Sequence, residues 1–155
     1  MPFMFSYGMN TNRALMYLRC KNATVVGPGI LWGYRLHFRY HCDVTHTSSL
    51  RNKVNGLIWE LDGDDLHLID DVEGYPEYYT RQELYVQLTD EAQRVINSNY
   101  WMCWVYKMNN QCGVEAPSDQ YLNAVLQGYE ENNIPKNQLY EALEFCNVSG
   151  DHYGS

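Results

Sequence analysis

The sequence has no apolar run of the roughly 20 residues that a helix needs to cross a bilayer, which excludes a helical membrane span. It has no Gly-x-Ser-x-Gly turn, no Gly-Lys-Ser or Gly-Lys-Thr phosphate loop and no Cys-x-x-Cys pair. These absences exclude the motifs of an α/β-hydrolase nucleophile, a P-loop nucleotide site and a paired-cysteine zinc or redox centre. The first ten residues lack a basic segment followed by a long apolar one, so they do not indicate a secretory signal.

Basic residues are scarce, with 11 Lys and Arg against 19 Asp and Glu in 155 residues and a net charge of -8. This balance disfavours a nucleic-acid partner. Residues 1–55 nevertheless hold seven of the basic residues and one acid, Asp43. In a folded domain this asymmetry is compatible with a pocket for a small anionic or zwitterionic ligand, or with ordinary scattered surface charge.

The five cysteines are odd in number and show no paired spacing. Reduced thiols and a cytoplasmic location explain this pattern better than a disulfide framework does. A chain of 155 residues with 45% hydrophobic residues can bury a core without a disulfide or a metal.

The first half of the chain is predicted to form several strands and one short helix. We expect a strand over Pro2–Tyr7 and then a helix, capped by Thr11 or Asn12, that runs to about Cys20 with Leu15, Met16 and Leu18 facing inward. Residues 23–40 are rich in β-branched and aromatic types, and from Leu31 they alternate as a strand with one wet face. Residues 43–53 are polar and predict a loop, and Val54–Leu61 predicts another strand.

The second half moves from strands to helices. The acidic segment from Asp62 predicts a helix that ends near Gly74. Strands over residues 78–88 and 99–108 flank a turn-rich connection, a loop covers 109–116, and helices cover 117–132 and 135–146. This order predicts an α+β fold, a small mixed, barrel-like sheet with flanking helices around one cavity. We expect one domain over residues 1–147 and a loose tail over 148–155.

Three alternative chemistries fail on their residue patterns. The segment Asp62–Glu73 has the length of a calcium loop, but leucine and histidine occupy positions that need an oxygen ligand and glycine. His37 and His41 would share a strand face, but no second pair completes a metal site. Cys42 is adjacent to His41, and neighbours in a strand point to opposite faces, so the pair does not predict a nucleophile.

Two segments remain as candidate sites. In Tyr7-Gly8-Met9-Asn10 a strand enters a turn whose backbone N–H groups could bind a carboxylate or an oxyanion, although an ordinary strand-to-helix turn has the same pattern. Glu73 ends a helix, where partial burial, the negative helix end and Asp70 one turn back would all raise its pKa. A carboxylate with a raised pKa is a useful general base, and a surface acid at a helix end is the alternative.

These segments, in this order, resemble the γ-glutamylcyclotransferase (AIG2-like) family along nearly the whole chain. Residues 5–10 (FSYGMN) resemble its YGSN motif, and residues 71–76 (DVEGYP) with Tyr78 and Tyr79 resemble the segment that carries its catalytic glutamate. Further similarity lies in Arg19-Cys20, in residues 26–29 and 33–36, in 54–59, and in 116–118 with Tyr121 followed by Ile134-Pro135. The resemblance implies the same barrel-like fold around one cavity.

The resemblance also implies an enzyme that cyclises a γ-glutamyl amide or amine to 5-oxoproline and releases the amine. It makes Glu73 the general acid and base, needs no metal or organic cofactor, and gives a small-molecule γ-glutamyl substrate rather than nucleic acid or membrane as partner. It places these residues at the substrate: Tyr7, Gly8, Met9, Asn10, Tyr79, Tyr106 and Tyr121. We expect a monomer or a weak homodimer.

Met9 departs from the family motif, because it replaces the serine of YGSN. The backbone amide survives this change, but a hydroxyl is lost and a larger thioether is added. If that hydroxyl contacts substrate, its loss costs roughly 1–3 kcal/mol or changes which ligand fits. The alternative function is therefore a non-catalytic protein that binds or sequesters a small ligand in the same pocket. The identity of the leaving amine cannot be read from the sequence.

Overall fold

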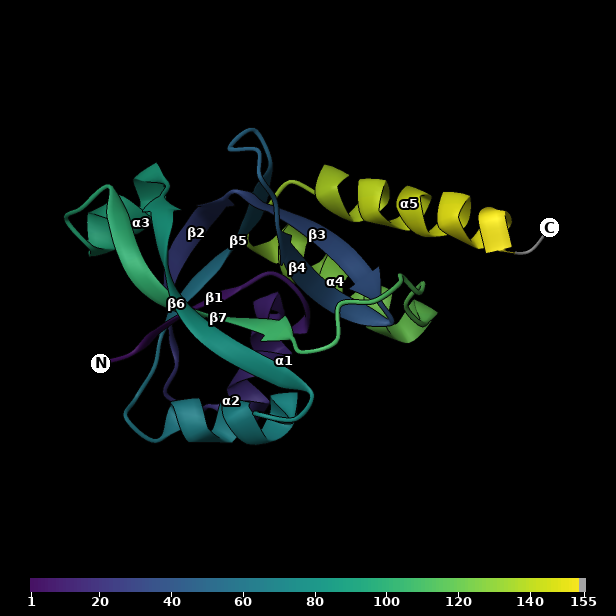
Figure 1. Cartoon of the computed structure of the whole chain (residues 1–155). Helices are drawn as coiled ribbons and strands as arrows, with labels where there is room; N and C mark the ends of the chain where they lie inside the picture. The colour runs from purple at the N-terminus through teal and green to yellow at the C-terminus, as the bar shows by residue number, and fades with distance from the viewer. Residues whose placement is uncertain (154–155) are drawn as a thin grey trace.

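Five strands of the computed structural model close into a small barrel (Figure 1). In order around the barrel they are β1 (Phe3–Ser6), β5 (Lys53–Glu60), β2 (Thr24–Trp32), β6 (Tyr79–Leu88) and β7 (Tyr100–Met108). Neighbours are antiparallel, except that β1 and β7 close the barrel through a parallel pairing. The structure describes residues 1–153, and the burial of the side chains of residues 1–148.

Over these described residues, a separate hairpin and six helical segments lie around the barrel (Figure 1). The hairpin pairs β3 (Tyr34–Arg39) with β4 (His41–His46). The helical segments are the 3-10 turn η1 (Met9–Thr11), α1 (Arg13–Arg19), α2 (Asp65–Glu73), α3 (Asp90–Val95), α4 (Asp119–Glu131) and α5 (Asn137–Tyr153). α4 packs on η1, and α5 packs on β3. The predicted α+β fold with a barrel-like sheet is therefore confirmed.

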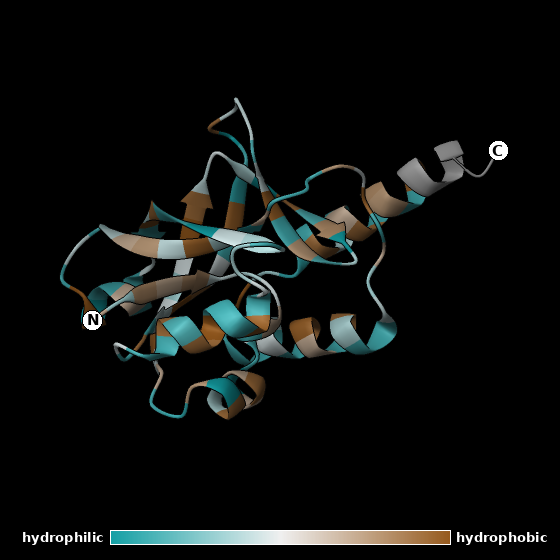
Figure 2. Ribbon diagram, turned by 60° about the horizontal axis from the view of Figure 1, so that its bottom comes forward, coloured by the Kyte–Doolittle hydropathy of each residue, from teal (hydrophilic) through white to brown (hydrophobic). Residues whose placement is uncertain are grey.

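The core fills the barrel and extends beneath the hairpin. Met4, Phe5 and Trp59 from β1 and β5 are almost completely buried, as is Phe38 from β3. In Figure 2 the strands alternate between hydrophobic and more hydrophilic residues, the period expected when one face of a sheet packs inward. The wet-faced strand predicted from Leu31 is confirmed in β3, where residues 34, 36 and 38 are buried and residue 35 is exposed.

Two elements of the structure were not predicted from the sequence, strand β4 and helix α3. The polar stretch expected to be a loop from residue 43 begins inside strand β4, because Asp43 is buried and bound by Arg39 rather than solvated. The connection between β6 and β7 contains helix α3, which lies against Gly27 of β2. Gly27 has φ of +146°, and a Cβ there would lie 2.8 Å from the Ala92 nitrogen.

Two helix details also differ from prediction. In α1, capped by Asn12 as predicted, Met16 is buried but Leu18 is 81% exposed, so the inward position of Leu18 was wrong. Helix α5 continues to Tyr153, past the end predicted at residue 146. The loose tail predicted over 148–155 falls largely on residues whose side chains lie outside the described part, so the domain boundary at 147 stays a prediction.

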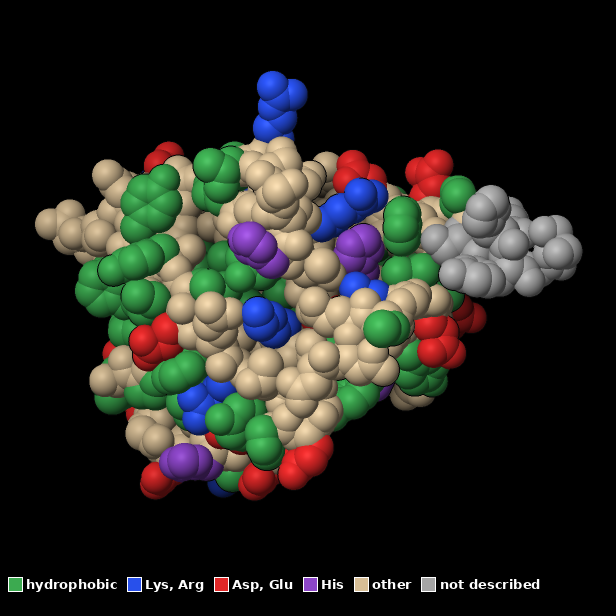
Figure 3. All heavy atoms as spheres, in the orientation of Figure 1, with side chains coloured by type: hydrophobic (Ala, Val, Ile, Leu, Met, Phe, Trp, Pro, Cys, Tyr) green, Lys and Arg blue, Asp and Glu red, His purple; other side chains and the backbone are tan. Residues whose placement is uncertain are grey.

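Charged side chains on the face shown in Figure 3 are interspersed with hydrophobic ones, which fits scattered surface charge on that face. His37 and His41 lie on different strands, separated by the turn at Tyr40 with φ of +69°, and the pairing of Arg39 with His41 places them on the same face of the hairpin, as predicted. Within the described residues, no three His, Cys, Asp or Glu side chains are grouped to hold a metal ion. Over the same residues, no helix has the length and apolarity to span a membrane.

Candidate active site

A cavity of about 180 Å3 lies where the first strand, the turn after it and the end of α2 meet. All eight residues predicted for the site line this cavity: Tyr7, Gly8, Met9, Asn10, Glu73, Tyr79, Tyr106 and Tyr121. They come from β1, η1, α2, β6, β7 and α4 or the residues next to them. The two segments singled out in the sequence, 7–10 and the end of α2, therefore face the same volume.

The Tyr7–Asn10 turn follows directly from β1. The Thr11 N–H donates to the Gly8 carbonyl at 3.1 Å, and the Thr11 hydroxyl donates to the same oxygen at 2.7 Å. The N–H groups of residues 8–10 thus precede the first hydrogen bond of the 3-10 turn and have no partner inside it. At Gly8, a Cβ would lie 3.0 Å from both the Tyr121 hydroxyl and the Cys42 Cβ, so only glycine lets these groups approach so closely.

Glu73 is the last residue of α2, which ends at Gly74 in the left-handed conformation with φ of +67°. The Asn10 amide donates to Glu73 Oε1 at 3.0 Å. Arg19 in turn donates to Asn10 Oδ1, which fixes which way the amide faces. Burial raises the pKa of Glu73, while the nearby Arg19 charge and the Asn10 hydrogen bond act in the opposite direction. The raised pKa predicted for Glu73 is confirmed in direction.

Asp70 does not act as predicted. It was expected to raise the pKa of Glu73 as a neighbouring negative charge. Instead Arg81 binds both Asp70 oxygens, at 2.8 and 3.1 Å, and the Tyr106 hydroxyl donates to Asp70 at 2.6 Å. The Asp70 carboxylate is therefore paired, and burial is the main cause of the shift at Glu73. The role of Asp70 is to hold Tyr106 in the cavity wall.

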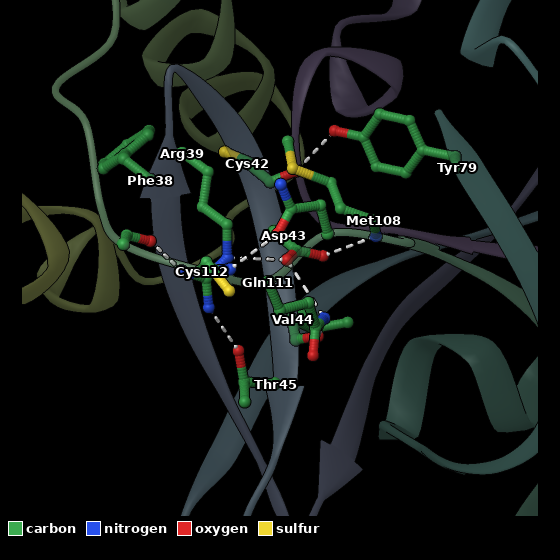
Figure 4. Close-up of polar contacts among 12 residues, drawn as sticks. Phe38, Arg39, Cys42, Asp43, Val44, Thr45, Tyr79, Met108, Gln111 and Cys112 are labelled. Carbon is green, nitrogen blue, oxygen red and sulfur yellow. Dashed lines mark hydrogen bonds and ion pairs between the residues drawn. The ribbon is translucent and has the colours of Figure 1, made fainter. Parts of the chain in front are cut away.

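Strand β4 is anchored by a buried carboxylate beside the cavity (Figure 4). Asp43 is completely buried and accepts hydrogen bonds from the Met108 N–H at 2.9 Å, the Arg39 Nε at 2.9 Å and the Gln111 amide at 3.0 Å. Cys42 precedes Asp43 in β4, so the hydrogen bonds to Asp43 also hold Cys42 in place at the cavity wall. The Tyr79 hydroxyl donates to the Cys42 carbonyl at 2.8 Å, a contact visible in Figure 4.

Eight cavity residues were not predicted as part of the site, and four of them bear on its chemistry: Arg19, His41, Cys42 and Tyr78. Arg19 had a usable signal, since it lies in one of the segments that resemble the family. His41 and Cys42 had none, because their place depends on the unpredicted strand β4. The ring of His41 packs 4.9 Å from that of Tyr121, and burial lowers the pKa of His41, which favours a neutral imidazole at the cavity.

The family model for gamma-glutamyl cyclotransferase, AIG2-like proteins matches residues 4–141. The chain belongs to this family. A search of curated proteins found no significant match. Family and fold together support a gamma-glutamyl cyclotransferase-like enzyme that acts on a small molecule.

Several solved structures have a fold similar to that of this chain. One described as gamma-glutamyl cyclotransferase is 22% identical, with a TM-score of 0.74 over 92% of this chain and 86% of that chain. An uncharacterized protein from Homo sapiens is 25% identical, with a TM-score of 0.73 over 92% and 85%. An AIG2-like protein from Mus musculus is 22% identical, with a TM-score of 0.60 over 79% and 82%.

Proposed function

We propose that this family member cyclises the γ-glutamyl group of a small amide or amine to 5-oxoproline, with Glu73 as general acid and base. The observation that carries the proposal is the position of Glu73. Its carboxylate is oriented by Asn10 and faces the cavity that the Gly8–Asn10 turn also lines. A base and a set of backbone donors in one small volume are what an intramolecular acyl transfer needs.

The reaction starts with the α-ammonium group of the substrate, which must lose a proton before its nitrogen can attack. Glu73 accepts that proton, and its raised pKa makes the carboxylate a stronger base than an exposed glutamate. The nitrogen then attacks the γ-carbonyl carbon of the same molecule and closes a five-membered ring. Because both reacting groups belong to one substrate, the protein mainly has to fold it and move protons.

The turn over residues 8–10 is the proposed binding site for the charged end of the substrate. Its N–H groups would hold the α-carboxylate and polarise the γ-carbonyl. Glu73 then returns its proton to the leaving nitrogen, and the bond to that nitrogen breaks as the tetrahedral intermediate collapses. The ring nitrogen still carries a second proton, which Glu73 accepts and passes to the released amine, so that the amine leaves as an ammonium ion and Glu73 is again a carboxylate. The sequence of steps is complete with the residues of this chain and needs no metal or organic cofactor.

Ligand binding without turnover is the second candidate, and Met9 favours it. The Met9 thioether lies 3.6 Å from an Arg19 guanidinium nitrogen, at a position where the family motif has a serine. A sulfur is a weak acceptor, so this contact supplies less than a hydroxyl could. Retention of Glu73 with its orienting amide favours the enzyme, since a binding protein has no use for a partly buried base.

The proposal is tested by incubating the protein with a panel of γ-glutamyl dipeptides and γ-glutamyl amines that differ only in the leaving amine. Mass spectrometry of 5-oxoproline and of the released amine reads out the reaction. We expect product from at least one class of leaving group. If no panel member yields 5-oxoproline while calorimetry shows that one of them binds, the binding function replaces the catalytic one.

A further inference from the structure

Five tyrosines line the cavity; Tyr78 is 46% exposed, and the other four differ in what their hydroxyl groups can offer a substrate. These four are Tyr7, Tyr79, Tyr106 and Tyr121. A phenol can donate one proton and accept through its lone pairs. Where the partner is a carbonyl or a carboxylate, the phenol must be the donor, and where the partner is a backbone N–H, the phenol must be the acceptor. The partners therefore fix the polarity of each hydroxyl.

Three of the four hydroxyls donate their proton to the protein. Tyr7 donates to the Tyr106 carbonyl, Tyr79 donates to the Cys42 carbonyl at 2.8 Å, and Tyr106 donates to Asp70 at 2.6 Å. Two of the acceptors are backbone carbonyl oxygens, which carry no proton. The third is the Asp70 carboxylate, which is paired with Arg81. These three hydroxyls can present only lone pairs to the cavity.

Tyr121 has the opposite polarity. Its hydroxyl oxygen accepts a hydrogen bond from the Cys42 N–H at 2.9 Å, so its own proton is not used in that contact. The backbone of Cys42 therefore binds two tyrosines with opposite hydrogen-bond polarity. Tyr79 donates to the Cys42 carbonyl, and Tyr121 accepts from the Cys42 N–H. The Cys42 thiol also lies near Tyr121, but a thiol sulfur is a weak acceptor compared with an oxyanion.

The Tyr121 hydroxyl is also placed at the backbone donors. It lies 3.0 Å from the position that a Cβ on Gly8 would take, at the start of the turn whose residues line the cavity. Burial raises the pKa of Tyr121, so the phenol keeps its proton across the neutral range. A neutral phenol beside the backbone amides of this turn is the kind of donor set that an oxyanion requires.

We propose that Tyr121 is a catalytic residue that donates a hydrogen bond to the γ-carbonyl oxygen as that oxygen becomes negative. This inference rests on the proposed cyclisation. When the substrate nitrogen bonds to the γ-carbon, the carbonyl π electrons move to the oxygen, and the Tyr121 O–H stabilises the resulting charge without losing its proton. The carbonyl re-forms when the bond to the leaving nitrogen breaks. Tyr79 faces the substrate with lone pairs and cannot replace this donor.

The first test compares the wild type with Tyr121→Phe on the best substrate of the panel. Removal of one oxyanion donor lowers kcat by about 100-fold or more. We expect that loss in kcat with little change in KM, because the hydrogen bond strengthens only in the transition state. Circular dichroism and thermal melting establish that the variant is folded. A folded Tyr121→Phe enzyme with a wild-type kcat overturns the inference and leaves the proposed function standing.

The second test asks for the direction of the hydrogen bond and avoids deletion of the hydroxyl. 3-Fluorotyrosine, a more acidic phenol, is incorporated at position 121 or, as the matched control, at position 79. The probe is a phosphinate analogue whose tetrahedral P–O⁻ replaces the γ-carbonyl. A stronger donor at 121 tightens phosphinate binding, whereas a poorer acceptor at 79 does not. Equal effects at the two positions, or weaker binding at 121, contradict the assignment of Tyr121 as donor.

The two proposals fail separately. A wild-type protein that makes no 5-oxoproline from any panel member removes the proposed function and with it the catalytic role of Tyr121. A wild-type protein that makes 5-oxoproline, together with an equally fast Tyr121→Phe variant, removes the role of Tyr121 alone. The product assay on these two proteins therefore separates the outcomes.

Discussion

At the scale of single residues, the account depends on a chain of three side chains that ends at Glu73. Arg19 donates to Asn10 Oδ1, and Asn10 donates through its Nδ2 to Glu73 Oε1. The Trp59 indole N–H holds the Asn10 carbonyl at 2.9 Å, so the backbone at Asn10 is fixed as well. Arg19 thus acts on Glu73 in two ways, through its charge and through the orientation of the Asn10 amide.

Arg19→Met removes a positive charge that favours the ionised form of Glu73. The pKa of Glu73, already raised by burial, then rises further. A general base works only when it is deprotonated, so activity is lost as pH falls through its pKa. We expect the acidic limb of the kcat/KM profile to move to higher pH in Arg19→Met. The pH profile of 5-oxoproline formation measures this shift.

Arg51→Met is the matched control for Arg19→Met, because Arg51 is an exposed arginine that does not line the cavity. It removes the same charge and leaves the acidic limb where it is in the wild type. An Arg19→Met enzyme that loses activity equally at all pH values would show that Arg19 only maintains structure. The role of Arg19 in setting the ionisation of Glu73 would then be wrong.

At the scale of the elements, the site depends on how closely α4 approaches the η1 turn. Gly128 of α4 faces η1, and a Cβ on it would lie 2.7 Å from the Asn12 nitrogen and closer still to Thr11. Tyr121 belongs to the same helix, two turns nearer its N-terminus. The contact at Gly128 therefore sets the distance between the Tyr121 hydroxyl and the Gly8 turn.

Gly128→Ala is expected to destabilise the protein although alanine is the better helix former. Overpacking costs about 1–3 kcal/mol, whereas the gain in helix propensity is at most about 1 kcal/mol. Gly63→Ala is the control, since nothing lies within 4 Å of a Cβ at that position. Urea unfolding compares the two. A Gly128→Ala protein as stable as Gly63→Ala would show that α4 is not held at the turn in this way.

The sequence predicted most elements because their signals are local. The alternation in residues 34–38 and the cap at Asn12 are each contained in a few neighbouring residues. Strand β4 escaped prediction because the burial of Asp43 depends on Arg39, Met108 and Gln111, two of which are more than sixty residues away. Helix α3 is six residues long, too short for a clear helical period, and its packing on Gly27 is non-local.

For the site, the sequence allowed a prediction of which residues belong to it but not of the contacts that they make. The resemblance to the family identified all eight predicted residues, and the structure brings them to one cavity. Their polarity could not be predicted, since it depends on which atoms of Cys42 and Asp70 they meet. The expected effect of Asp70 on Glu73 failed for the same reason, because Arg81 is eleven residues away along the chain and its pairing with Asp70 is set by the fold.

At the scale of the whole molecule, the fold buries four of the five cysteines and leaves Cys112 exposed. All five are free, as the odd count predicted. Burial raises the pKa of Cys42 and of Cys103 to about 12, so these thiols are also poor nucleophiles at neutral pH. We expect one fast-reacting thiol in the native protein and five after denaturation, measured with a chromogenic disulfide reagent.

Cys112→Ser serves as the control for that titration and should abolish the fast reaction. Fast modification of two or more thiols in the native wild type would contradict the packing of the barrel around Cys103 and of β4 around Cys42. This measurement tests the fold independently of any activity.

The central claim is that Glu73 performs the chemistry in a cavity assembled by the whole fold. The most direct test compares 5-oxoproline release by the wild type and by Glu73→Gln on the same γ-glutamyl substrate, with substrate binding to both proteins measured by calorimetry. Glutamine can still accept the Asn10 hydrogen bond but cannot take up a proton at the working pH. We predict that Glu73→Gln binds the substrate and releases no measurable 5-oxoproline. Product formation by Glu73→Gln at the wild-type rate would contradict the account.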